Sequence, residues 1–187
     1  MIVLMGVAGA GKSMQGRLLA DERGYAWIST GEILRVLVTG KRRQEMLAGQ
    51  LLSDAEMIRL MDKVLDLIDL QEEFILDGFP RTVGQADWLL NQLKYGQLKV
   101  SAVIHLVASP EVVKKRLLSR GRPDDYEEAI EVRLREYDRT ILPVLDELKK
   151  NHVNVYDIDA EKSVEEVHSE ILKAVKANTA SDSDNKD

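Results

Sequence analysis

Short apolar runs alternate with longer amphipathic stretches along this chain, and the alternation predicts its secondary structure. The runs predicted to form strands are residues 2–5, 25–28, 74–77, 103–107 and 153–158. Between them, apolar side chains recur at the three- and four-residue spacing of amphipathic helices. Short strands that alternate with helices predict an α/β fold with a doubly wound parallel sheet, which binds its ligands at the carboxyl ends of the strands.

Capping residues and helix breakers predict where the helices begin and end. Gly24 is expected to stop a helix that starts at Lys12, and Ser53 or Asp54 to cap a long helix whose apolar positions continue to Ile68. A further helix is expected to begin at Pro110, because proline is favoured in the first turn of a helix. Other expected features are an exposed turn at 40–43, helices at 85–94 and 126–150, a tight break at 121–125 and a last helix capped by Ser163.

Composition and charge restrict the class of protein. With 187 residues and a hydrophobic fraction of 44%, the chain can bury one sizeable core, which suits a single domain. The net charge of -6 disfavours nucleic acid as a partner, and no apolar run approaches the length of a membrane span. The first strand begins at Ile2 without a basic leader, and the chain has no cysteine. We therefore expect a cytoplasmic protein that binds neither nucleic acid nor a membrane. We also expect a monomer.

Residues 6–13 read G-V-A-G-A-G-K-S and lie between the first predicted strand and the first predicted helix. This pattern in this context is typical of a phosphate-binding loop, because glycines let the backbone N–H groups point inward toward an anion. Lys12 is placed to reach the β- and γ-phosphates of a nucleotide, and the Ser13 hydroxyl to bind the magnesium that bridges them. A glycine-rich turn without a ligand is the alternative, and the intact motif favours nucleotide binding.

Arginines gather near strand ends and helix breaks in a chain that is negatively charged overall. Such a gathering predicts a second anionic ligand beside the first nucleotide. The arginines in question are Arg35, Arg81, Arg116, Arg120, Arg122 and Arg133. The histidines, in contrast, have no metal-binding or catalytic pattern around them, and we interpret His105, His152 and His168 as structural.

Several motifs occur in the order that is found in the adenylate kinases, and the chain resembles this branch of the nucleoside monophosphate kinase family to about Ala177. The matching stretches are residues 6–15, 29–35, 49–51, 77–82, 116–120, 122–125 and 133–134. The resemblance implies a five-stranded fold of the P-loop NTPase type. The implied organisation is a single domain at 1–177, a small AMP-binding insert at 30–52, a vestigial lid at 120–125 and a disordered polar tail at 178–187.

The resemblance also implies reversible phosphoryl transfer from ATP to AMP that gives two ADP, with Mg²⁺ as cofactor. The residues that it assigns to ATP are Gly9, Ala10, Gly11, Lys12, Ser13, Met14, Arg116 and Arg120. Those that it assigns to AMP are Thr30, Arg35, Gln50, Leu51, Leu52, Gly78, Arg81, Gln85, Arg122 and Arg133. The catalytic residues that it implies are Lys12, Arg81, Arg120, Arg122 and Arg133, and the magnesium-binding ones are Ser13 and Asp77.

The chain departs from the family pattern in the phosphate loop and in two short segments. Ala8 stands where the family usually has proline, and Ser13 and Met14 stand where it usually has glycine and threonine. The insert between residues 36 and 49 and the turn at Gly121 are shorter than in most relatives, although the charged residues remain. We therefore expect phosphoryl transfer to persist and the exclusion of water to weaken.

Two other functions fit parts of the same sequence. A UMP/CMP kinase typically has alanine in place of Thr30 and asparagine in place of Gln85, so both residues here favour adenine. A non-catalytic nucleotide-binding or assembly factor keeps the loop without the transfer machinery. The retained arginines argue against it, namely Arg81, Arg120, Arg122 and Arg133. An assay of ADP formation with AMP, CMP, UMP and no acceptor separates these alternatives.

Overall fold

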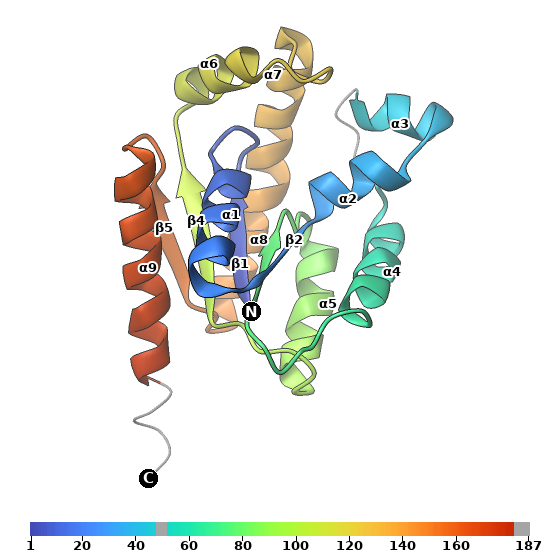
Figure 1. The fold of residues 1–187 in the computed structure, drawn as a ribbon. Coiled ribbons are helices and arrows are strands. Elements are labelled where there is room, and N and C mark those ends of the chain that lie inside the picture. The colour runs from blue at the N-terminus through green and yellow to red at the C-terminus, as the bar shows by residue number, and fades with distance from the viewer. Residues whose placement is uncertain (48–51, 182–187) are drawn as a thin grey trace.

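A computed structural model describes residues 1–47 and 52–181 of the chain, and Figure 1 shows how the elements are arranged. The sheet has five parallel strands in the order β2-β3-β1-β4-β5. The strands are β1 (Ile2–Gly6), β2 (Ala26–Ser29), β3 (Phe74–Asp77), β4 (Ala102–Val107) and β5 (Val155–Asp159). The predicted five-stranded parallel sheet is confirmed, and each predicted run overlaps one of these strands.

Helices connect the strands and cover both faces of the sheet (Figure 1). The helices before β3 are α1 (Lys12–Arg23), α2 (Thr30–Leu37), α3 (Gly40–Leu47) and α4 (Asp54–Leu65). Those that follow β3 are α5 (Val83–Lys94), α6 (Pro110–Arg120), α7 (Glu127–Glu136), the π-helix η1 (Tyr137–Ile141), α8 (Leu142–Lys150) and α9 (Val164–Ser181). None of the helices in the described part of the chain is both long and apolar enough to cross a membrane.

Alternate residues of β1 point to opposite faces of the sheet and join two separate cores. Val3 and Met5 pack with buried residues of α5 and α8, and Ile2 and Leu4 pack with buried residues of α1 and α9. A central strand of a parallel sheet is apolar on both sides because helices cover both faces. The chain moves from one side of β1 to the other after β3, so the switch point of the topology lies at the carboxyl end of β1.

Hydrogen bonds at the caps confirm several predicted helix boundaries. Gly24 ends α1 in a left-handed conformation with a φ of 71°, and its N–H donates back into the last turn. Ser53 and Glu56 form a capping box at the start of α4. The Ser163 hydroxyl likewise accepts a backbone N–H in the first turn of α9. Such side chains are needed because the first N–H groups of a helix have no partner within it.

The exposed turn predicted at 40–43 is wrong, because Gly40 begins helix α3. Arg42 pairs with Glu45 one turn further along this helix, and a pair at this spacing favours the helical conformation. Arg42 also pairs with Glu56 of α4. Gly40 has a φ of 61° and so still separates α3 from α2. The segment is therefore exposed as predicted, but it is helical.

The single helix predicted at 126–150 is interrupted by the π-helix η1 between α7 and α8. Pro143 lies in the first turn of α8 and has no N–H to donate, and its ring clashes with the regular position of the carbonyl four residues earlier. The helix widens at this point, as π-helical turns do. The Thr140 hydroxyl donates to the Glu136 carbonyl at 2.6 Å and so satisfies an acceptor within the widened turn.

Two helix ends also differ from the prediction. α4 ends at Leu65, before the predicted Ile68, in a turn where Asp69 accepts a nearby backbone N–H. α9 continues to Ser181, past the predicted start of the tail, because polar composition without glycine or proline does not by itself end a helix. The rest of the expected tail, residues 182–187, lies outside the described residues.

Candidate active site

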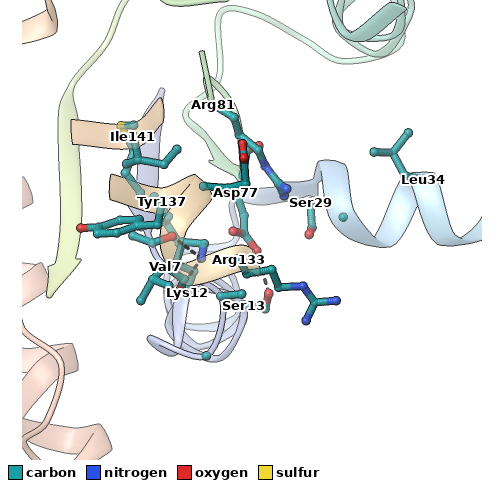
Figure 2. Close-up of a pocket in the computed structure, with 18 of the residues that line it drawn as sticks. Val7, Lys12, Ser13, Ser29, Leu34, Asp77, Arg81, Arg133, Tyr137 and Ile141 are labelled. Carbon is teal, nitrogen blue, oxygen red and sulfur yellow. Dashed lines mark hydrogen bonds between the residues drawn. The ribbon is translucent and has the colours of Figure 1, made fainter. Parts of the chain in front are cut away.

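A pocket of about 510 Å³ opens at the carboxyl ends of β1 and β3, at the switch point of the sheet. Figure 2 shows Lys12, Ser13, Asp77, Arg81 and Arg133 around it. These side chains come from α1, from the end of β3 and the segment that follows it, and from α7. Segments far apart in the sequence therefore build one site.

The loop between β1 and α1 has the backbone geometry of an anion-binding nest. Gly9 and Gly11 have φ values of 88° and 99°, which residues with a Cβ rarely adopt. A Cβ on Gly9 would also lie 2.9 Å from Leu117 of α6, so the loop packs too closely there for a larger residue. Helix α1, all of which is described, has no acidic residue in its first turn, and its positive end therefore remains available to an anion.

Lys12 turns its ammonium into this loop, where it donates to the carbonyls of Gly6 at 2.7 Å and Val7 at 2.9 Å. Desolvation lowers the pKa of Lys12 from 10.5 to about 8. The Asp77 carboxylate opposes this lowering of the pKa, whereas the charges of two nearby arginines add to it. The site thus holds several cations close together, and an anionic ligand would relieve their repulsion.

Ser13 and Asp77 form the pair predicted to hold magnesium. The Ser13 hydroxyl donates to Asp77 Oδ2 at 2.8 Å, and Asp77 is buried at the end of β3. Hydroxyl and carboxylate oxygens suit Mg²⁺, which often takes one or two protein ligands and completes its shell with phosphates and water. Among the described residues, no group of three or more His, Cys, Asp or Glu side chains could hold a metal by itself. The pair therefore fits a magnesium ion that arrives with a nucleotide.

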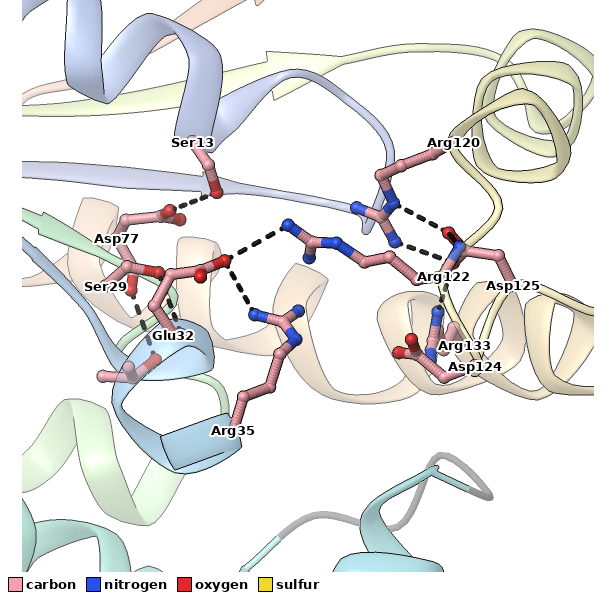
Figure 3. Close-up of polar contacts among 11 residues, drawn as sticks. Ser13, Ser29, Glu32, Arg35, Asp77, Arg120, Arg122, Asp124, Asp125 and Arg133 are labelled. Carbon is pink, nitrogen blue, oxygen red and sulfur yellow. Dashed lines mark hydrogen bonds and ion pairs between the residues drawn. The ribbon is translucent and has the colours of Figure 1, made fainter. Parts of the chain in front are cut away.

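Asp125 holds three of the predicted arginines around the short segment after α6 (Figure 3). Its buried carboxylate accepts from Arg120 Nε at 2.8 Å, from Arg120 Nη2 at 2.7 Å and from Arg133 Nη1 at 3.3 Å. It also accepts the backbone N–H of Arg122 at 3.1 Å, and Asp124 pairs with the other Nη of Arg133. Burial raises the pKa of Asp125, but the hydrogen bonds from Arg120 and Arg122 and the nearby positive charges outweigh it and lower that pKa overall.

Glu32 of α2 links arginines from two sides of the pocket (Figure 3). Its Oε1 accepts from Arg35 Nη1 at 2.9 Å and from Arg122 Nη2 at 3.2 Å. Desolvation and the charge of Arg122 lower the pKa of Arg35, and the carboxylate of Glu32 opposes that change. A phosphate group that entered here would compete with Glu32 for the same donors.

Two polar side chains predicted for AMP lie buried beside the end of β3. Thr30 is fully buried, and its hydroxyl is positioned to donate to the carbonyls of Asp77 at 3.2 Å and Gly78 at 3.0 Å. Gln85 is also buried, but it lines the pocket, and its Oε1 accepts the Arg81 N–H at 2.9 Å. The Arg81 Nε donates to the Gly78 carbonyl at 2.7 Å, which aims the guanidinium along the wall of the pocket.

The structure brings most of the predicted residues to this pocket. Those that line it are Gly9, Gly11, Lys12, Ser13, Met14, Arg35, Leu52, Asp77, Gly78, Arg81, Gln85, Arg116, Arg120, Arg122 and Arg133. Ala10 and Thr30 are buried and do not line it. Gln50 and Leu51 lie outside the described residues.

Sequence reasoning missed the acidic partners of these arginines and the apolar wall of the pocket. Glu32, Asp124 and Asp125 stand inside matched motifs, but no spacing in the sequence says which arginine each of them pairs with. Leu34 and Met57 line the pocket, although their helical spacing is typical of ordinary core positions. Only the three-dimensional arrangement distinguishes these roles.

A phosphate loop, an oxygen pair that suits magnesium and arginines from three helices share one pocket, which is the arrangement that transfer of a phosphoryl group between two nucleotides requires. The class of protein is therefore a P-loop nucleoside monophosphate kinase. Comparison with known proteins agrees with this class, because a family model for adenylate kinase matches residues 4–153.

The chain is also similar to adenylate kinases from several bacteria. It is 40% identical over 180 residues to that of Corynebacterium urealyticum, covering 93% of this chain and 98% of the relative. It is 37% identical to that of Leptospira biflexa and 36% identical to that of Mycobacterium sp. (strain MCS), with the same coverage of both chains. The chain belongs to the adenylate kinase family. The predicted family, enzyme class and ATP:AMP phosphotransfer are thereby confirmed.

Proposed function

We propose that the pocket holds ATP and AMP at opposite ends and that the γ-phosphoryl group passes between them. In this assignment Lys12 and the phosphate loop hold the ATP phosphates, Arg116 lies against the ATP base, and Arg35 and Arg81 hold the AMP phosphate. The observation that supports it best is that Lys12 of the phosphate loop, Asp77 and the acceptor-side Arg81 line the same pocket of about 510 Å³. A phosphoryl group can pass directly between two nucleotides only when both are held in one such volume.

Arg120, Arg122 and Arg133 are proposed to surround the transferred group and to stabilise its charge. Phosphoryl transfer needs in-line positioning and cations around three equatorial oxygens, and it needs little covalent help from the protein. Hydrogen bonds to Asp125 hold the guanidinium groups of Arg120 and Arg133 before the nucleotides arrive. The Arg122 guanidinium is held by Glu32 instead. Donors that are already in place cost little reorganisation at the moment of reaction, which is how electrostatic stabilisation becomes effective.

Ser13 and Asp77 are proposed to hold the magnesium that accompanies ATP, Ser13 through its hydroxyl oxygen and Asp77 through water. When bound, the ion neutralises charge on the β- and γ-phosphates. The hydrogen bond between Ser13 and Asp77 already places the two oxygens together next to Lys12. No further protein ligand is required, because the phosphates and water complete the shell.

The insert at 30–52 is proposed to form the AMP end of the pocket. Leu52 and Gln85 line the pocket, and Gln85 is assigned to the AMP base. Thr30 does not line the pocket but supports this end of it, because its hydroxyl donates to the Gly78 carbonyl close to Arg81. Gln50 and Leu51 are assigned to AMP by family resemblance alone.

We propose further that the protein acts as a monomer in the cytoplasm. The described residues of the site lie on one chain and line or support one pocket, so the site needs no second copy to complete it. The absence of cysteine from the sequence suits a reducing compartment. In the same arrangement residues 1–177 act as one domain, with residues 120–125 as a vestigial lid.

An assay of ADP formation tests this function directly. The purified protein is supplied with ATP and Mg²⁺ and is offered AMP, CMP, UMP or no acceptor. We expect ADP formation with AMP to exceed by far the formation with the other acceptors. A higher rate with CMP or UMP than with AMP would identify a UMP/CMP kinase. A rate of ADP formation that is the same with and without an acceptor would identify an ATPase. No turnover at all would indicate a non-catalytic nucleotide-binding factor.

A further inference from the structure

Two protein groups, one a hydrogen-bond acceptor and the other a donor, fix the side-chain amide of Gln85 in one orientation. Its Nε2 donates to Asp54 Oδ1 at 2.9 Å, and its Oε1 accepts the backbone N–H of Arg81 at 2.9 Å. A carboxylate can only accept hydrogen bonds, and a backbone N–H can only donate them. The reversed amide would place two acceptors together and two donors together, and leaving such buried groups unpaired is costly.

Asp54 is itself held in place for this contact. It is the first residue of α4, and its Oδ1 also accepts the Thr82 hydroxyl at 2.6 Å. Thr82 is the N-cap of α5, and its hydroxyl oxygen accepts the Gln85 N–H at 3.3 Å. A Cβ on Gly84 would lie 2.5 Å from Asp54 Oδ2, so α5 packs directly against this carboxylate. The side chain of Asp54 therefore ties the beginnings of two helices together.

The fixed amide of Gln85 leaves one N–H and one oxygen lone pair for a ligand. Gln85 is 1% exposed, and it lines the pocket, so the ligand that can use them is one inside the pocket. An amide in this orientation complements a base edge on which a ring acceptor stands next to an exocyclic amine. Adenine has that edge. Guanine and hypoxanthine have a ring N–H next to a carbonyl, and they require the opposite orientation of the amide.

We infer that Asp54 is a positioning residue that makes the acceptor site prefer 6-aminopurines to 6-oxopurines, because it fixes the amide of Gln85. The inference rests on the proposed function, which places the base of the acceptor nucleotide at this end of the pocket. Asp54 does not line the pocket, and it acts through Gln85 rather than on the nucleotide. Cytosine offers the same edge as adenine, so this contact separates amino bases from oxo bases and does not separate AMP from CMP.

The test measures kcat/KM for AMP, IMP and CMP, with ATP and Mg²⁺, in the wild type and in Asp54→Ala. We expect the ratio of the AMP value to the IMP value to fall by about tenfold or more in Asp54→Ala, the scale of one hydrogen bond to a charged group. The ratio of the AMP value to the CMP value is expected to stay near that of the wild type. A general loosening of the site would instead lower all three values together.

Two further variants serve as controls. Asp54→Asn keeps an oxygen that can accept from Gln85 and is expected to retain the wild-type ratio of AMP to IMP. Glu56→Ala removes another carboxylate from the first turn of α4, where Glu56 completes the capping box with Ser53. It is expected to leave both ratios unchanged. If Asp54→Ala does not fold, Asp54→Ser replaces it, because a hydroxyl can donate as well as accept and does not fix the amide.

The inference is overturned if the preference for AMP over IMP in Asp54→Ala equals that of the wild type, or if the preference over CMP falls in parallel. It is also overturned if Asp54→Asn loses as much as Asp54→Ala. A wild type that forms no ADP from AMP contradicts the proposed function instead. In that case equilibrium binding of AMP and IMP, measured by calorimetry, still tests Asp54, with the same expected loss of preference.

Discussion

Lys12 carries its charge in surroundings that disfavour it, and a bound phosphate is proposed to relieve this cost. Desolvation lowers its pKa to about 8, and the charges of Arg81 and Arg120 add to this lowering. The carbonyls of Gly6 and Val7 accept its hydrogen bonds and compensate for only part of the lost hydration. A cation held in this way is available to stabilise negative charge that develops between the nucleotides.

Lys12→Met is expected to abolish most of the transfer and to leave the fold intact. The loss should be at least about 3 kcal/mol in the barrier, or a hundredfold in kcat, which is the scale of one preorganised electrostatic group. Initial rates of ADP formation measure the first effect, and thermal unfolding followed by circular dichroism measures the second. Lys150→Met, on the exposed end of α8, is the matched control and should retain the wild-type rate. Near-normal turnover of Lys12→Met would remove the support for the phosphate loop assignment.

ATP binding is expected to weaken as the pH rises above 8. In the nucleotide-free protein the pKa of Lys12 is about 8, so the ammonium loses its proton as the pH passes that value. Phosphates favour the charged form and raise the pKa, and binding must therefore take up a proton at higher pH. The dissociation constant should then rise, approaching about tenfold per pH unit. Calorimetry at pH 9 in two buffers of different ionisation enthalpy measures the uptake, which should be absent in Lys12→Met.

At the scale of elements, the strands and most helix starts follow from sequence patterns, and the internal form of the long helix does not. The five strands are short apolar runs, and Ser53 and Ser163 are caps that a sequence shows directly. The π-helix arises from Pro143 together with packing against the sheet. Such packing leaves no periodic pattern of apolar residues from which the sequence could predict it. The helix at 40–47 is joined to α4 by the ion pair between Arg42 and Glu56, which connects positions that are distant in the sequence.

The π-helix also places Tyr137 against the sheet, and this contact is expected to stabilise the fold. Burial raises the pKa of Tyr137, so its hydroxyl stays protonated and can donate to His105 Nε2, which lies 2.5 Å away. His105 Nδ1 in turn lies 2.6 Å from Asp157 Oδ1. Tyr137→Phe leaves a buried nitrogen without its partner and should lower the free energy of unfolding by about 1–3 kcal/mol.

Urea denaturation measures this change, with Tyr126→Phe as the control. Tyr126 is 44% exposed, and its substitution should change the free energy of unfolding by less than about 0.5 kcal/mol. Equal stability of Tyr137→Phe and the wild type would show that the bond between Tyr137 and His105 contributes nothing. The interpretation of His105 as structural would then need another basis.

At the scale of the whole molecule, the sequence predicts which cations gather at the site but not how they are held. Arginines beside strand ends converge because parallel strands bring their carboxyl ends to one edge of the sheet. Glu32 and Asp125 decide which arginine points where, and each accepts from residues that are distant in the sequence or on another element. Asp54 is similar, since its hydrogen bond to Gln85 joins two helices. Pairings of this kind appear only once the chain is folded.

The segment that connects α6 to α7 is too short to cover much of the pocket. α6 ends at Arg120 and is capped by Gly121, which has a φ of 66°, and α7 begins at Glu127. A lid normally keeps water from competing with the acceptor as nucleophile. Here Asp125 already holds the arginines through hydrogen bonds, so their charge is in place without a covering loop. Charge stabilisation should therefore persist while the exclusion of water weakens.

We expect AMP-dependent transfer to be accompanied by a measurable hydrolysis of ATP in the absence of AMP. Phosphate release measures the hydrolysis, and Lys12→Met, which should lose both activities, excludes a contaminating ATPase. Nucleotide binding should order residues 30–52 more than the region around Gly121, because the bonds to Asp125 hold that region before binding. Hydrogen exchange with and without a bisubstrate analogue measures this difference. Absent hydrolysis, together with strong protection centred on residues 118–126, would show that the short segment still closes as a lid.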